Sequence, residues 1–229
     1  MAVTPKTDEA FLREVDEELR RDQIVGVWKN YGRVIIGLIV AALAIFAGVL
    51  GWRAWSHGAA EKQAIELQQA YDSIASGNTQ AAKAPIDKLA GESAPGYRAL
   101  AKMLQGNDLL AAGKTKEAAA KYGEVAGDSS VGQPIRDLAT IRQTHTEFDA
   151  LAPQVVIDRL KPLATSDSAW LGSAGEMIAM ADLKLNRLAE ARAMFKLIAE
   201  SDKVPDSIRQ RAVQATQALD PGTNVQKGK

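Results

Sequence analysis

One stretch of the chain is apolar without interruption, whereas the remainder mixes apolar and polar positions. Residues 34–51, VIIGLIVAALAIFAGVLG, contain no charged and no strongly polar side chain. A helix of this length rises about 27 Å, which roughly matches a hydrocarbon core about 30 Å thick. Trp28 precedes the stretch and Trp52 and Trp55 follow it, as membrane interfaces favour. The pattern predicts a transmembrane helix at 34–52.

Two other interpretations of this stretch meet specific objections. A buried core helix of a soluble protein would need protein on every side, and 229 residues can hardly supply it. A cleaved signal peptide is also conceivable, because Ala54-Trp55-Ser56 loosely resembles a small-x-small cleavage site. However, the leader before the stretch is long and contains many acidic residues, unlike the short basic n-region of a signal peptide.

Basic residues flank the stretch unequally. They are Arg20, Arg21, Lys29 and Arg33 before it, and Arg53 and Lys62 shortly after it. Since basic residues accumulate on the cytoplasmic side of a span, the excess predicts a cytoplasmic N-terminus. Residues 1–33 are then a cytoplasmic leader, partly helical, and the larger part of the chain lies across the membrane.

After residue 55 the pattern becomes that of amphipathic helices. Apolar residues recur at the i, i+3, i+4, i+7 spacing, and alternation typical of strands is almost absent. Glycine, proline and small polar residues break the pattern at Gly77-Asn78, Gly91 to Pro95, Gly113, Gly127 to Gly132, Ala152-Pro153, Ser166 to Ser168, Asn186 and Val204-Pro205. These breaks give about nine helical segments, and we expect an all-α fold.

Four segments align with one another as internal repeats. Their equivalent reference residues are Ala82, Ala118, Val156 and Ala191, at spacings of 36, 38 and 35 residues. Twelve residues before each reference stands a small residue: Ala70, Gly106, Thr144 and Ala179. Five residues before it stand Gly77, Gly113, Leu151 and Asn186, and four residues after it the bulky Ile86, Tyr122, Leu160 and Phe195. Small residues allow two helices to pack closely, and glycine or asparagine allows a tight turn, so each repeat is expected to be a helical hairpin.

This order of a small residue, a turn, an alanine and a bulky apolar residue resembles the tetratricopeptide repeat. Asp182 stands where that family usually has an aromatic residue, so the copies are degenerate. We therefore expect a tetratricopeptide-like solenoid at 56–219 whose last helix, Asp206 to Leu219, is a C-terminal capping helix with a polar outer face. Asp206 is expected to be the N-terminal cap residue of that helix. Residues 220–229 lack periodicity and are expected to be disordered.

Composition argues against several functions. The chain has 28 basic and 28 acidic residues and therefore no net charge, which argues against nucleic-acid binding. It has no cysteine, which removes disulfides, Cys-ligated metals and thiol nucleophiles. Its two histidines, His57 and His145, lie in no HExxH, GxSxG or P-loop motif. We expect no cofactor, no metal site and no enzymatic activity.

Binding of other proteins is more plausible, because the first helix of each hairpin in such a solenoid lines a concave surface. Two interpretations of the inward positions remain open: a groove for extended, unfolded or apolar segments, or the core of a tightly curled stack. The positions lack the lysines and arginines that hold a charged carboxyl terminus. The projected positions are Leu67, Tyr71, Ile74, Leu100, Met103, Asn107, Leu110, Leu138, Ile141, His145, Phe148, Glu176, Met180 and Leu183.

The order of leader, span and repeats resembles the YfgM family, ancillary subunits of the bacterial SecYEG translocon. The resemblance lies in Gly51-Trp52-Arg53-Ala54-Trp55, in Gly96 to Ala101 and in Gly113 to Lys121. It implies a single-pass inner-membrane protein with a periplasmic tetratricopeptide-like domain and a non-enzymatic, chaperone-like role. The implied partners are the SecYEG translocon, a PpiD-type periplasmic chaperone and unfolded or nascent secreted proteins. A scaffold that assembles other cell-envelope complexes remains the alternative.

Overall fold

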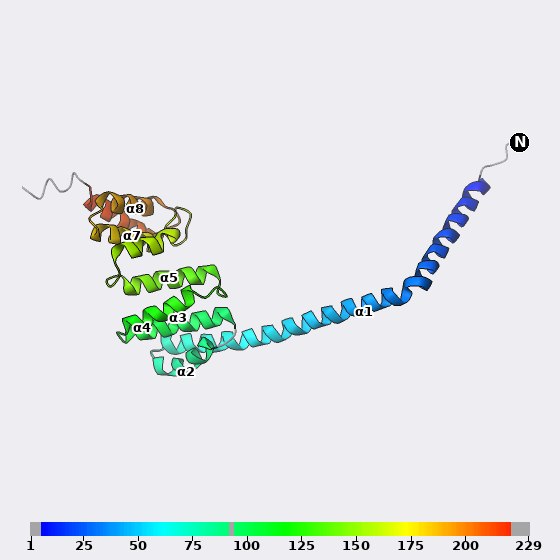
Figure 1. Cartoon of the computed structure of the whole chain (residues 1–229), viewed down its shortest axis with the longest axis horizontal. Helices are drawn as coiled ribbons and strands as arrows, with labels where there is room; N and C mark the ends of the chain where they lie inside the picture. The colour runs from blue at the N-terminus through cyan, green and yellow to red at the C-terminus, as the bar shows by residue number, and fades with distance from the viewer. Residues whose placement is uncertain (1–5, 92–93, 221–229) are drawn as a thin grey trace, which may run out of the picture. The chain divides into compact units, whose positions relative to one another are not determined.

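The computed structural model describes the backbone of residues 6–91 and 94–220, and every regular element in those ranges is a helix (Figure 1). The all-α prediction is therefore confirmed. The helices are α1 (Lys6–Ala75), α2 (Thr79–Ala90), α3 (Pro95–Ala111), α4 (Thr115–Ala126), α5 (Gln133–Glu147), α6 (Pro153–Leu160), the short 3-10 helix η1 (Lys161–Leu163), α7 (Leu171–Lys184), α8 (Leu188–Glu200) and α9 (Asp206–Ala218). The chain divides into two compact units, Met1–Glu61 and Lys62–Lys229.

The first unit is the larger part of α1, and it contains the apolar stretch. Tyr31–Arg53 is long and apolar enough to cross a membrane, and none of its apolar window is buried against protein. A core helix of a soluble protein would be covered, so this exposure favours a lipid environment. The rings of Trp52 and Trp55 stand next to each other, with centroids 5.6 Å apart.

One continuous helix replaces three predicted segments. The expected leader helix, the span and the first helix of the first repeat all belong to α1. No proline or asparagine lies between Tyr31 and Ala75 to end the helix, and Gly51 and Gly58 are tolerated within it.

The second unit is a stack of four hairpins followed by one helix. The hairpins pair the last part of α1 with α2, α3 with α4, α5 with α6, and α7 with α8, and α9 packs against α8. Neighbouring helices contact one another in chain order, as Figure 1 shows for α3, α4 and α5. Three clusters of buried apolar side chains run through the stack.

Three of the four hairpins turn through a residue in the left-handed region. Gly77, Gly113 and Asn186 have φ of 80°, 75° and 58°, as expected from their place five residues before the reference position. Asn78 then caps α2, because its side-chain Oδ1 accepts a hydrogen bond from the N–H of Ala81 at 3.2 Å. The third hairpin has Leu151 at the equivalent position and no positive φ, and Pro153 begins its second helix instead.

The small and bulky positions of the repeats form the interior. Every reference residue and every small residue twelve positions earlier is buried, and so is every bulky residue four positions later. In the second hairpin a Cβ atom on Gly106 would lie 2.5 Å from Cε1 of Tyr122, which explains why this position has no side chain. The repeat alignment therefore identified the residues that close each hairpin.

The end of the stack differs from the sequence prediction in one detail. Asp206 is the first residue of α9 and not its cap; Pro205 occupies the cap position, and no side chain caps the helix. The carboxylate of Asp206 instead accepts a hydrogen bond from Arg209 one turn along α9. Of the tail predicted to be disordered, Asp220 accepts a hydrogen bond from Arg192 at 2.5 Å, and 221–229 lie outside the described residues.

Candidate protein-binding face

Three of the projected groove residues belong to the core. Leu67, Met103 and Ile141 occupy equivalent positions, fifteen residues before the reference, and each is only 7% exposed. Each contributes to a different one of the three buried clusters. For these three side chains the structure supports interior packing, the second of the two interpretations.

A second set of equivalent positions is exposed in every hairpin. Eleven residues before the reference stand Tyr71 and Met180, 41% and 47% exposed, and the polar Asn107 and His145, which are also exposed. Eight residues before it, Ile74 and Leu110 are exposed, while Phe148 and Leu183 are half-buried. Positions four and three residues apart share one side of a helix, so each hairpin offers the same side of its first helix. We call these eight residues the candidate face: Tyr71, Ile74, Asn107, Leu110, His145, Phe148, Met180 and Leu183.

The remaining projected residues have structural partners. Leu100 and Leu138 are half-buried and pack against two of the clusters. Glu176 accepts hydrogen bonds from Nε and Nη2 of Arg211 at 3.0 and 2.8 Å, which connects α7 to α9. Leu100, Leu138 and Glu176 therefore stabilise the stack. Because Glu176 does not belong to the candidate face, the face is mainly uncharged.

One polar group of the candidate face, the side-chain amide of Asn107, is held by a core residue. The hydroxyl of Tyr122 donates a hydrogen bond to Oδ1 of Asn107 at 2.7 Å. Burial raises the pKa of Tyr122 above its ordinary 10.0, so its hydroxyl remains a donor even at moderately alkaline pH. This bond holds the amide of Asn107 in one orientation, with Nδ2 left as a donor. Farther along, the ammonium of Lys184 lies 4.3 Å from the centroid of the Phe148 ring and 2.9 Å from Oδ1 of Asp149.

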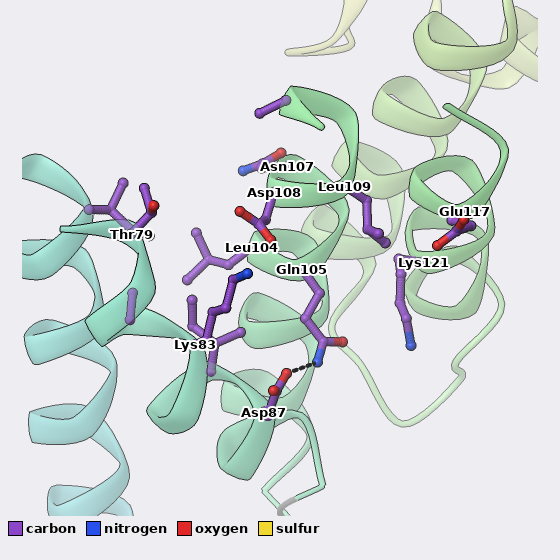
Figure 2. A pocket seen from close by; sticks show the side chains of 14 residues that line it. Thr79, Lys83, Asp87, Leu104, Gln105, Asn107, Asp108, Leu109, Glu117 and Lys121 are labelled. Carbon is purple, nitrogen blue, oxygen red and sulfur yellow. Dashed lines mark hydrogen bonds between the residues drawn. The ribbon is translucent and has the colours of Figure 1, made fainter. Parts of the chain in front are cut away.

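A hollow that the sequence did not indicate lies over α3, between α2 and α4. Its volume is about 530 Å³. Figure 2 shows Lys83 and Asp87 on the α2 side, Glu117 and Lys121 on the α4 side, and Gln105 between them. Its lining comes from residues spread over the two hairpins, so no local motif marks it.

Buried charge is rare in the domain, and the described residues contain no group of three or more His, Asp or Glu side chains arranged to hold a metal ion. Asp182 is the buried exception, and burial raises the pKa of its carboxyl. Arg187 lies 3.8 Å from Oδ1 of Asp182 and partly offsets that effect. Asp182 is therefore an unfavourably buried carboxyl, at the position where the tetratricopeptide family usually has an aromatic residue.

Stacked helical hairpins with equivalent exposed positions define a helical-repeat protein of the kind that binds other proteins. A family model described as a tetratricopeptide repeat-like domain matches residues 26–216, and the chain belongs to that family. No curated protein and no solved structure matches the chain.

Proposed function

We propose that this protein is a membrane-anchored holder of other polypeptide chains, and that it serves the Sec translocon as an ancillary subunit. In this proposal the span crosses the bacterial inner membrane once, the N-terminus is cytoplasmic and the repeat domain lies in the periplasm. Its partners are SecYEG, a PpiD-type chaperone and newly translocated, still unfolded proteins. It performs no enzymatic reaction and needs no cofactor.

The recurrence of exposed side chains at equivalent positions of four hairpins carries this proposal. An isolated exposed apolar residue means little, but exposure repeated at one position along a stack forms a continuous surface. Tyr71, Ile74, Leu110 and Met180 supply apolar area to it. An extended, unfolded chain offers the apolar side chains that such a surface takes up.

Anchoring suits weak, reversible binding. A domain tethered beside a translocation exit meets emerging chains at a high effective concentration, so little affinity is needed. Low affinity also permits the bound chain to leave and fold.

Site-specific crosslinking in growing cells tests the proposal. A photoreactive residue replaces Tyr71 or Met180 on the candidate face, and Ala84 or Ala193 on exposed positions of α2 and α8 as matched controls. Many nascent secreted proteins, crosslinked from the face and not from the controls, are the expected products. One or two fixed, folded partners would instead identify a scaffold of envelope complexes, and a reporter fused after Lys229 that is active only in the cytoplasm would contradict the topology.

Polar substitutions separate binding from folding. Tyr71→Ser and Met180→Ser are expected to weaken client capture while the circular dichroism spectrum stays unchanged, because both side chains are exposed. Met103→Ser is expected to destabilise the domain by about 2–5 kcal/mol, because Met103 is buried in the core. Unchanged capture by the two exposed variants would contradict a binding role of the face.

A further inference from the structure

The hollow over α3 has an apolar floor. The buried side chains of Ala82 and Ile86 of α2 and Leu104 of α3 form much of this floor, and Ile74 also lines the hollow. At about 530 Å³ it falls within the range of about 300–1,000 Å³ that is typical of ligand sites. Ile74 and Asn107 line the hollow and also belong to the candidate face, so the two surfaces are continuous.

The rim of the hollow is polar but nearly neutral. Its ionisable residues are Lys83, Asp87, Asp108, Glu117 and Lys121, two basic and three acidic. Such a rim does not favour a phosphate or another strongly charged ligand. An uncharged, partly apolar ligand fits it better.

Within the described part of the chain, two charged groups of the rim have neither an ion-pair partner nor a side-chain hydrogen bond, whereas Asp87 has no ion pair but accepts the hydrogen bond from Gln105. The two groups are the ammonium of Lys83 and the carboxylate of Asp108, both on exposed residues. Both reach the same apolar floor from different helices (Figure 2). A hydrogen-bond donor and an acceptor therefore stand above apolar surface.

Gln105, which lines the hollow between α2 and α4, carries a buried acceptor (Figure 2). Nε2 of Gln105 donates to Oδ1 of Asp87 at 2.7 Å, whereas its Oε1 is buried and has no hydrogen-bond partner. An acceptor without a partner is unfavourable in the interior. A hydrogen-bond donor that reaches this oxygen from the hollow would satisfy it.

We infer that this hollow is a second docking site, which takes one aliphatic side chain of an extended polypeptide segment. Each residue of an extended chain presents one acceptor, one donor and one side chain. The main-chain carbonyl would meet Lys83, an N–H would meet Asp108, and the side chain would lie on Ile86 and Leu104. This inference rests on the proposed function, because it assumes that the domain holds polypeptides, and it adds a selective site beside the candidate face.

Fluorescence anisotropy with the full-length chain in detergent micelles tests the inference. The probes are a labelled glycine-serine peptide with one central leucine and the same peptide with serine in its place. Wild-type protein is expected to bind the leucine peptide at least about tenfold more tightly, as burial of one aliphatic side chain allows. Equal binding of the two peptides would overturn the inference.

Substitutions locate the binding. Ala111 lines the hollow and is exposed, so Ala111→Phe is expected to fill it and remove the preference for leucine. Ala112→Phe, at the adjacent exposed residue outside the lining, should retain the preference. Asp108→Ala and Lys83→Ala, which do not disturb the core, should each weaken binding of the leucine peptide severalfold. If Ala111→Phe, Asp108→Ala and Lys83→Ala all bind the leucine peptide as tightly as the wild type does, the inference is overturned.

A third probe keeps the two proposals distinguishable. An unfolded secreted protein should bind to wild type and more weakly to Tyr71→Ser. If it does so while Ala111→Phe binds both peptides like wild type, the hollow is not a site and the proposed function stands. If wild type binds no unfolded protein, the proposed function fails.

Discussion

Gly106 and Tyr122 share one space: the Tyr122 ring, fully buried on α4, lies where a side chain at Gly106 of α3 would be. The hydroxyl of the same tyrosine then reaches Asn107, the next residue along α3. A core contact and a residue of the candidate face are thus adjacent in sequence. Packing inside the second hairpin therefore determines how its outer side chain is presented.

Gly106→Ala is expected to destabilise the domain by about 1–3 kcal/mol, because the new Cβ would clash with the Tyr122 ring. Urea denaturation followed by circular dichroism measures this change. Gly96→Ala is the matched control in the same helix, since a Cβ there meets nothing within 4 Å, and it should be neutral or slightly stabilising. Equal stability of the two variants would contradict the close contact between Gly106 and the Tyr122 ring.

Tyr122→Phe keeps the ring and removes the hydrogen bond to Asn107, at a cost of about 1 kcal/mol. Burial raises the pKa of Tyr122 above its ordinary 10.0, so wild-type stability should fall as pH rises above about 10, where the unfolded chain ionises first. In Tyr122→Phe, the fall in stability above about pH 10 should be smaller, because the variant lacks the hydroxyl that ionises. Identical alkaline profiles in thermal melts would contradict the burial of the hydroxyl.

Asp182→Asn is expected to raise the melting temperature at pH 7. Burial raises the pKa of Asp182, so the folded state holds the proton more tightly than the unfolded state. Wild-type stability therefore declines as pH rises from about 3.8 through the folded pKa, and the asparagine variant avoids that decline. The advantage should disappear near pH 3, whereas Asp202→Asn at an exposed position should change little at either pH.

Asp128 provides the opposite dependence at the loop between α4 and α5. Its carboxylate accepts hydrogen bonds from the hydroxyl and N–H of Ser130 and from Arg98 of α3, which lowers its pKa from 3.8 to about 2. The stability it contributes is complete above about pH 4 and is lost as pH falls through about 2. Asp128→Asn should lower the melting temperature at pH 7. It should also reduce the fall in melting temperature between about pH 4 and about pH 2. An unchanged dependence of the melting temperature on pH in this range would show that these hydrogen bonds do not persist in solution.

Most of the hairpin architecture could be predicted because its determinants are local. A left-handed turn needs glycine or asparagine, and a close helix contact needs a small residue, so Gly113 and Gly106 are visible in the sequence. The division of the first helices into core and face is not local. Leu67 and Tyr71 lie one turn apart, yet one is buried and the other exposed, because only Leu67 packs into the cluster formed with α2 and α3.

The hollow and the continuity of α1 escaped prediction for different reasons. The hollow depends on the separation of α2 and α4, which are not consecutive in the chain. The continuity of α1 follows from the absence of a helix-ending residue after Arg53. The change in composition at residue 55 instead suggested a boundary between two helices.

Each hairpin has its own turn and its own close helix contact at a small residue. Each hairpin is therefore a local structural unit of the domain. Under tension such a stack is expected to unfold one hairpin at a time, and to refold one hairpin at a time when the load is released. Optical-tweezer traces of the domain should therefore show several small extensions, and a single rip spanning the domain would contradict this. The domain would then lengthen in steps under load while most of its hairpins stay folded.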